Sequence, residues 1–83
     1  MPQLTLYLRQ GCHLCEDMLQ QLQQLQQHRQ FGLALCDVDS NEQWRNLYHE
    51  RVPVLFGGEE LLCQYFLDLK RLETYLDEHS TSH

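Results

Sequence analysis

Lysine and arginine are scarce in this chain of 83 residues. Together they number 6, against 12 aspartates and glutamates, which leaves a formal net charge of −6. A protein that binds nucleic acid needs clustered cations that displace counterions from phosphates, and docking on anionic lipid needs a similar cluster. The composition therefore argues against nucleic acid and against a membrane surface as partners.

Long apolar runs are also missing. No stretch approaches the roughly 20 apolar residues of a membrane-spanning helix. The segment from Met1 to Leu8 lacks the basic region and the small-residue cleavage site of a signal peptide, so we expect a cytoplasmic protein. In that reducing compartment the 4 cysteines are not expected to form structural disulfides.

The length of the chain predicts one domain, and neither a repeat nor an internal linker divides the sequence. We place this domain at residues 1–78 and a polar, frayed tail at residues 79–83. Apolar residues make up 42% of the chain, which suits a globular core and argues against disorder.

The spacing of the apolar residues predicts the strands and helices. Alternation with a period of two, or an unbroken apolar run, predicts strands over residues 4–8, 33–38, 52–56 and 61–66. A spacing of three or four residues predicts a Gln-rich amphipathic helix from Cys12, a short helix over residues 42–50, and a last helix capped by Asp68. The order is βαβαββα, and its first strand–helix–strand unit implies parallel strands. We expect an α/β fold: a four-stranded mixed sheet flanked by helices on both faces.

Three local expectations follow from the same patterns. The run over residues 33–38 is nearly all apolar, as in a strand that is covered on both faces. Gly57 and Gly58 are expected to form the two-residue turn of a hairpin between the third and fourth strands. The apolar face of the second helix consists of Trp44, Leu47 and Tyr48.

The most informative motif is the pair Cys12 and Cys15, which lies between the first predicted strand and the first predicted helix. Two intervening residues place both sulfurs on the first turn of the helix, close enough to form a disulfide. The helix dipole favours an anion there by about 0.3–1 kcal/mol, and the thiolate is the reactive form of cysteine. Such a dithiol can cycle between reduced and oxidised forms, with Cys12 as the nucleophile and the deeper Cys15 as the resolving thiol.

A structural zinc site is the competing interpretation of this pair. Zinc sites in proteins normally have four ligands, often in two close pairs. The remaining cysteines, Cys36 and Cys63, are single and lie on different predicted strands, where each is expected to pack as a small hydrophobic side chain. A Cys-X-X-Cys motif beside a strand–helix–strand pattern therefore favours redox chemistry, and we assign no metal ligands.

These features resemble the glutaredoxins of the thioredoxin-fold superfamily, and most nearly the small bacterial glutaredoxin-like proteins. The resemblance covers nearly the whole chain. It rests on the strand over residues 4–8, the sequence Cys12-His13-Leu14-Cys15, the sequence Arg51-Val52-Pro53, and the order of elements. Between the cysteines, His13 and Leu14 replace the Pro-Tyr or Pro-Phe that is usual in glutaredoxins.

The resemblance implies several roles around the dithiol. It implies a cis peptide bond before Pro53, beside Cys12, although only about 5–6% of X-Pro bonds in folded proteins are cis. It implies that the backbone of Val52 pairs with a bound thiol peptide as a β-strand would, and that Arg9 binds a carboxylate of glutathione. It also points to Asp68, at the start of the last helix, as the candidate for binding the γ-glutamyl end of glutathione.

We hypothesise that the chain is a cytoplasmic thiol–disulfide oxidoreductase. It is expected to be a monomer with no bound cofactor, and to act on protein thiols and disulfides or to use glutathione as co-substrate. One alternative is a binding or adaptor module of the same fold with little turnover. The other is a protein that binds a metal ion or cluster through the Cys12–Cys15 pair.

Overall fold

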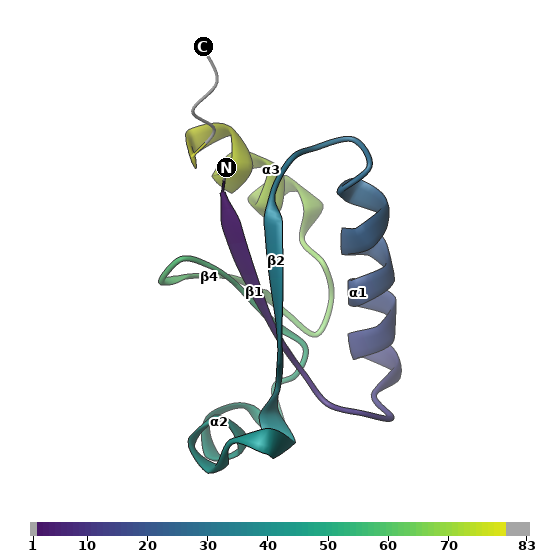
Figure 1. Cartoon of the computed structure of the whole chain (residues 1–83), viewed down its shortest axis with the longest axis vertical. Coiled ribbons are helices and arrows are strands. Elements are labelled where there is room, and N and C mark those ends of the chain that lie inside the picture. The colour runs from purple at the N-terminus through teal and green to yellow at the C-terminus, as the bar shows by residue number, and fades with distance from the viewer. Residues whose placement is uncertain (1, 80–83) are drawn as a thin grey trace.

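The computed structural model describes residues 2–79 and confirms the predicted order of elements. The strands are β1 (Gln3–Leu8), β2 (Gly32–Asp37), β3 (Val54–Gly57) and β4 (Glu60–Gln64). The α-helices are α1 (His13–Leu25), α2 (Glu42–Tyr48) and α3 (Leu69–His79), and a short 3-10 helix, η1 (Val38–Ser40), precedes α2. Figure 1 shows α1 and α3 beside the sheet and α2 at its lower end.

The strands form one mixed sheet in the order β2-β1-β3-β4. β1 runs parallel to β2 and antiparallel to β3, and β3 runs antiparallel to β4. Leu6 lies between Leu35 of β2 and Leu55 of β3, so the leucines of β1 line one face of the sheet because side chains alternate along a strand.

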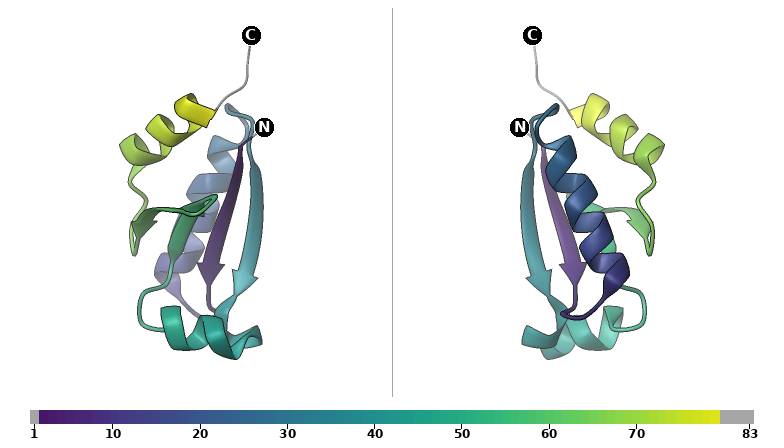
Figure 2. Two further views of the ribbon diagram at one scale, coloured as in Figure 1. Left: turned by 90° about the vertical axis from the view of Figure 1, so that its left-hand side faces the viewer. Right: turned by 90° about the vertical axis from the view of Figure 1, so that its right-hand side faces the viewer.

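The main core lies between this face of the sheet and the helices α1 and α3. Met18 and Leu22 are four residues apart on α1 and are fully buried, as the apolar spacing of that helix predicts. The core cluster consists of Leu4, Leu6, Met18, Leu22, Phe31, Leu55, Leu62, Leu72, Tyr75 and Leu76. Figure 2 shows α1 on one face of the sheet and α2 at the lower end of the opposite face.

The first turns of α1 and α3 are each capped by a side chain, and the cap of α3 is the predicted one. Cys12 is the N-cap of α1. Asp68 caps α3, since its carboxylate accepts a hydrogen bond from the backbone N–H of Arg71 at 3.0 Å. α3 ends at His79, the first residue of the predicted tail, and the rest of that tail lies outside the described residues.

Two expectations about burial are wrong. β2 is an edge strand, and Leu35 on it is 50% exposed, so this apolar run is not covered on both faces. On α2, Leu47 is 51% exposed, whereas the rings of Trp44 and Tyr48 pack against Tyr7 of β1, Trp44 edge-on and Tyr48 at a tilt of 31°. The helix has no fully buried residue because it covers only the end of its face of the sheet.

The hairpin is shifted by one residue from the predicted turn. Gly57 is the last residue of β3, and Gly58 and Glu59 make the turn, with Gly58 at a φ of +62°. β4 ends at Gln64, two residues before the predicted end, because Tyr65 has a φ of +67°, outside the range of a regular strand. Within residues 2–79, no helix is long and apolar enough to cross a lipid bilayer.

Candidate active site

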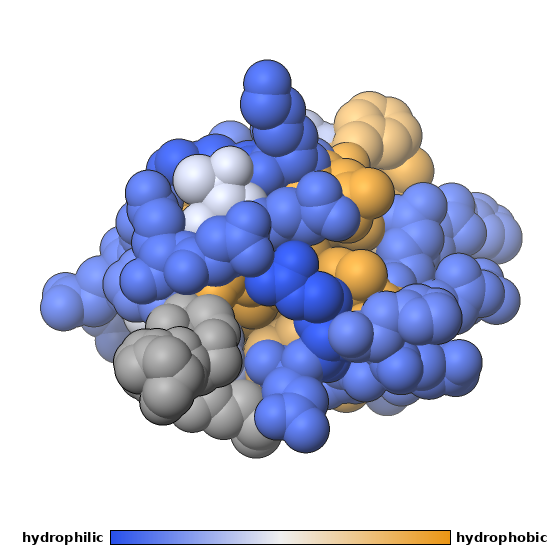
Figure 3. All heavy atoms as spheres, turned by 90° about the horizontal axis from the view of Figure 1, so that it is seen from above, coloured by the Kyte–Doolittle hydropathy of each residue, from blue (hydrophilic) through white to orange (hydrophobic). Residues whose placement is uncertain are grey.

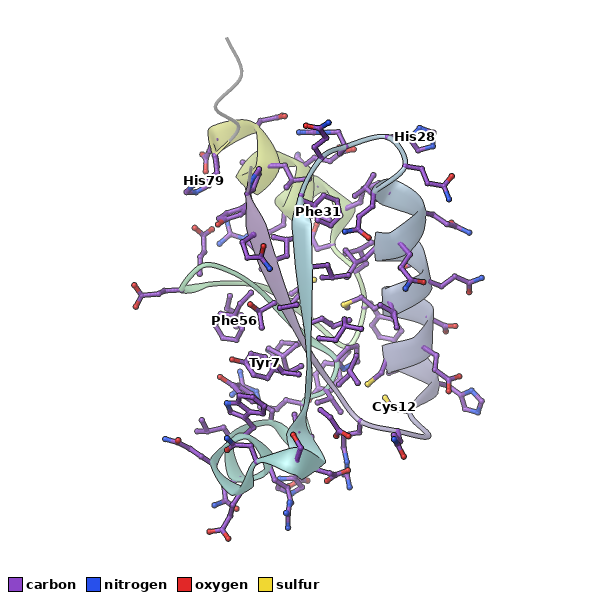
Figure 4. All side chains as sticks on the ribbon, in the orientation of Figure 1. Tyr7, Cys12, His28, Phe31, Phe56 and His79 are labelled. Carbon is purple, nitrogen blue, oxygen red and sulfur yellow. The ribbon has the colours of Figure 1, made fainter. Side chains whose placement is uncertain are left out.

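Cys12 lies at the point where the chain turns from β1 into α1. Gly11, with a φ of +76°, makes this turn, a conformation that glycine adopts without steric cost. Cys12 itself is extended and half-buried, and its Sγ accepts a hydrogen bond from the backbone N–H of Cys15 at 3.2 Å. The sulfur therefore sits at the positive end of the helix, at the lower end of α1 in Figure 4.

Cys15 is the buried partner of this pair. Its side chain is 2% exposed and packs in a small cluster with Val38 and Val52. Burial raises the pKa of the Cys15 thiol to about 12; a side-chain hydrogen bond with Cys12 adds to the rise, and a backbone hydrogen bond from Arg9 acts in the opposite direction. At neutral pH Cys15 is therefore protonated, and only Cys12 of this pair is accessible from solvent.

The peptide bond between Val52 and Pro53 is cis, as the resemblance implies. Both residues are buried, and Val52 shares its cluster with Cys15, against which Cys12 also packs. The backbone N–H of Val52 donates to the carbonyl of Tyr48 at 3.1 Å. Among the backbone hydrogen bonds of the described loops and turns, none is accepted by the Val52 carbonyl.

Arg9 directly follows β1, and its side chain bonds to one residue before α2 and one residue after it. Its Nε lies 3.2 Å from a carboxylate oxygen of Asp39 in η1, and its Nη1 donates to the carbonyl of His49 at 3.5 Å. The side chain is 39% exposed. Arg9 thus lies beside the dithiol, close enough for its charge to act on the pKa of Cys15.

Asp68 lies beside Cys63 and not in the cluster that holds Cys15. Burial raises the pKa of the Cys63 thiol, and a backbone hydrogen bond from Asp68 acts in the opposite direction. The carboxylate of Asp68 is already engaged in capping α3. The structure therefore brings Cys12, Cys15 and Val52 together and leaves Asp68 at the start of α3.

The two remaining cysteines are half-buried; Cys63 packs against the main core as expected, whereas Cys36 is not among the residues of either core cluster. Burial raises the pKa of Cys36, as it does that of Cys63. Among the described residues, no group of 3 or more His, Cys, Asp or Glu side chains is arranged to hold a metal ion. Cys12 and Cys15 could therefore supply at most half of a typical four-ligand zinc site.

One residue beside the cis-proline loop, Tyr65, was not identified from the sequence. Tyr65 donates its backbone N–H to the carbonyl of Pro53 at 2.9 Å and its hydroxyl to the carbonyl of Glu50 at 3.1 Å. These two bonds hold the residue after β4 against the cis-proline loop. Glycine or asparagine is the usual sign of a positive φ, so a tyrosine gives no such sign.

The comparisons with known proteins agree with this geometry. Residues 3–77 match the model of the glutaredoxin-like domain family (DUF836). The chain belongs to this family. No curated protein matches its sequence.

Solved structures support the family and the fold. The solution structure of protein Ne2328 from Nitrosomonas europaea is 45% identical, with 89% of each chain covered and a TM-score of 0.77. A target protein from X. campestris, solved by X-ray diffraction, is 32% identical, with 90% of this chain and 96% of that chain covered and a TM-score of 0.66. Thioredoxin O1 from Arabidopsis thaliana, in its oxidised state, is 16% identical, with 94% and 77% covered and a TM-score of 0.64, so it supports the fold alone. This glutaredoxin-like domain therefore has a thioredoxin-like fold.

Proposed function

We propose that this protein is a thiol–disulfide oxidoreductase in which Cys12 is the nucleophile and Cys15 the resolving thiol. The observation that supports the proposal is the difference between the two cysteines. Cys12 is half-exposed at the helix N-terminus, whereas Cys15 is 2% exposed and its pKa is raised to about 12. A partner can therefore reach the sulfur of Cys12, and the buried sulfur of Cys15, one helical turn away, can attack only after Cys12 has reacted.

The reaction has two exchange steps. The Cys12 thiolate attacks one sulfur of a substrate disulfide; that S–S bond breaks, and the departing sulfur leaves as a thiolate that takes up a proton. Cys15 then gives up its proton and attacks the Sγ of Cys12. This releases the second substrate thiol and leaves a Cys12–Cys15 disulfide, so that two electrons have passed to the substrate.

A reductant must then restore the dithiol. Two molecules of glutathione, or one protein dithiol, can supply the two electrons and become the new disulfide. The exposed guanidinium of Arg9 beside the cysteine loop favours an anionic thiol such as glutathione. Asp68, the candidate for binding the γ-glutamyl end of glutathione, already caps α3 with its carboxylate, and this favours a protein dithiol as the reductant. We propose that the protein works as a cytoplasmic monomer, where both kinds of reductant occur.

Mass spectrometry of single-cysteine variants tests the mechanism. A peptide whose cysteine carries a mixed disulfide with a small thiol is incubated with the wild type, Cys12→Ser and Cys15→Ser. Cys15→Ser is expected to accumulate a covalent adduct on Cys12, because nothing resolves it. Cys36→Ser is the control, since that thiol lies on β2 outside the pair, and it should behave as the wild type.

If Cys12→Ser keeps full disulfide-exchange activity, Cys12 is not the nucleophile and the proposed mechanism is wrong. A wild type that reacts with neither the peptide, glutathione disulfide nor a protein disulfide would instead favour the adaptor interpretation. The same preparation, analysed for iron and zinc after mild purification, addresses the remaining alternative.

A further inference from the structure

The resolving thiol, Cys15, is closed off from solvent by a small group of side chains. The cluster around it has three buried members, and their exposed fractions are 0% for Val38, 2% for Cys15 and 8% for Val52. Val52 is thus the member nearest to the surface, and a movement of Val52 would open the cluster first. The accessibility of Cys15 therefore depends on what holds Val52 in place.

Val52 lies in the segment of residues 49–53, which joins α2 to β3 and belongs to neither element. The backbone N–H groups of Arg51 and Val52 both donate to the carbonyl of Tyr48, at 2.8 and 3.1 Å. These two bonds fix the segment only on the side of α2. A connecting segment with few hydrogen bonds of its own opens easily unless another part of the chain fixes it.

Tyr65 fixes this segment from the other side. Its hydroxyl donates to the carbonyl of Glu50 at 3.1 Å, and its backbone N–H donates to the carbonyl of Pro53 at 2.9 Å. The two accepting carbonyls lie on either side of Val52 in the sequence. One residue thus anchors the chain before Val52 and the chain after it.

The backbone conformation of Tyr65 depends on these two bonds. Its φ of +67° is uncommon for a residue other than glycine, and such a conformation persists where the surrounding structure determines it. Exposure alone, at 41%, does not single out Tyr65. Figure 3 looks onto the end of the molecule remote from Cys12 and also shows apolar surface between polar side chains. What distinguishes Tyr65 is the pair of hydrogen bonds to Glu50 and Pro53.

A closed Cys15 has a chemical advantage in the proposed reaction. If an outside disulfide reacted with Cys15 as well as with Cys12, each sulfur would carry its own mixed disulfide, and neither could resolve the other. Shielding restricts the attack of Cys15 to the sulfur of Cys12. Burial also raises the pKa of the Cys15 thiol, so little of it is thiolate when an outside disulfide approaches.

We propose that Tyr65 is a positioning residue that holds Val52 in the cluster around Cys15, so that the resolving thiol reacts with the sulfur of Cys12 and not with an outside disulfide. This inference rests on the proposed function, because it concerns the resolving step of that reaction. The effect of Tyr65 passes through the backbone carbonyls of Glu50 and Pro53.

Alkylation of Cys15 by iodoacetamide tests the inference without any turnover. The parent protein is Cys12→Ser, because serine is itself a favoured N-cap and because the tryptic peptide of residues 10–29 then contains Cys15 as its one cysteine. Tyr65→Phe in this parent removes the hydroxyl bond to Glu50 and keeps the ring. Loss of one hydrogen bond should raise the alkylation rate of Cys15 by about three- to tenfold.

The same digest contains an internal control. Cys36 lies in the tryptic peptide of residues 30–45, on β2 at the other edge of the sheet, and its alkylation rate should stay unchanged. Tyr75→Phe is the matched variant, since it removes a hydroxyl from a core tyrosine outside the Cys15 cluster, and it should leave both rates unchanged. Tyr65→Gly also lacks the hydroxyl but adopts a positive φ without steric cost, and it should accelerate Cys15 at least as much as Tyr65→Phe.

The pH dependence of alkylation separates a local effect from a general one. Below its raised pKa the rate for Cys15 grows about tenfold per pH unit, so the expected gain in Tyr65→Phe moves this profile to lower pH by about 0.5–1 unit. The profile of Cys36 should not move. If the Tyr65 variants alkylate Cys15 at the rate of the parent, or accelerate Cys15 and Cys36 equally, Tyr65 does not position Val52 and the inference is wrong. The proposed function would stand in both cases, because it fails only on the activity of the wild type and Cys12→Ser.

Discussion

The backbone N–H of Cys15 donates a hydrogen bond to the sulfur of Cys12 across 3.2 Å. This one contact has two consequences. It caps the first turn of α1, where a serine or aspartate oxygen would usually act, and it directs a donor at the sulfur that must carry negative charge in order to react. The same hydrogen bond therefore serves both the start of α1 and the reactivity of Cys12.

The resolving step should become faster with pH well beyond the range of an ordinary thiol. Because the pKa of Cys15 is raised to about 12, mainly by burial, the fraction of attacking thiolate grows about tenfold per pH unit below that value. Formation of the mixed disulfide removes the charge of Cys12 but not the burial, so the rise should persist above pH 9. Stopped-flow measurement of peptide release from a preformed Cys12 mixed disulfide checks this, and a plateau near pH 9 would contradict it.

The same shift predicts how stability depends on pH in the reduced protein. Between the ordinary pKa of 9.0 and the value of about 12, the unfolded chain has lost the Cys15 proton and the folded chain retains it. The folded state then binds more protons, so the free energy of unfolding falls as pH rises, by at most about 1.4 kcal/mol per pH unit for this group. Below pH 9 the contribution is fully present.

Urea unfolding of the wild type and Cys15→Ala at pH 8, 9, 10 and 11, with a reductant present, measures this contribution. The decline should be shallower in Cys15→Ala. The other groups whose pKa is raised, Tyr7, Cys36 and Cys63, are common to both proteins and cancel in the difference. Parallel declines in the two proteins would show that Cys15 is not the group responsible.

Most of the architecture could be predicted because it depends on apolar spacing. The leucines of β1 and the positions Met18 and Leu22 of α1 repeat at the periods of a strand and a helix, and they occupy the core as predicted. The Cys12–Cys15 pair could be placed at the start of α1 because the two cysteines and the first turn of that helix are consecutive in the sequence. The cis bond before Pro53 came from the family resemblance alone, since most bonds of this kind are trans.

What the sequence did not predict depends on tertiary context. Leu35 and Leu47 belong to regular apolar patterns, yet the first lies on an edge strand and the second on a helix too short to cover its face of the sheet. The φ of Tyr65 is set by hydrogen bonds to Pro53 and Glu50, which are distant in sequence. Strand order and such long-range contacts are not encoded in local periodicity.

The ion pair between Arg9 and Asp39 should contribute little to stability. Both side chains are about two-fifths exposed, at 39% and 42%, and pairs of this kind are typically worth about 0.2–1 kcal/mol. Asp39→Asn also removes the longer contact of Asp39 with Arg45, at 3.9 Å and also exposed, and should therefore lower the free energy of unfolding by about 1 kcal/mol or less. Urea titrations at low and high NaCl check this, because salt should weaken the wild type and change the variant less. A loss above about 2 kcal/mol would mean that the pair is not screened as an exposed pair should be.

Gly57 and Gly58 should differ in how they respond to alanine, although they are neighbours in the hairpin. A Cβ at Gly57 would lie 2.5 Å from the ring of Tyr75, which is itself packed in the core, so Gly57→Ala must displace α3 or the ring. We expect a loss of about 1–3 kcal/mol, as in other overpacked cores.

At Gly58 a Cβ meets the Tyr75 hydroxyl at an ordinary 3.5 Å, and the cost comes from the φ of +62°, about 1–2 kcal/mol. The double variant Gly57→Ala/Tyr75→Leu separates the two causes, because a smaller side chain should relieve the clash at Gly57. If Tyr75→Leu leaves the cost of Gly57→Ala unchanged in thermal or urea unfolding, the clash with the ring is not its origin.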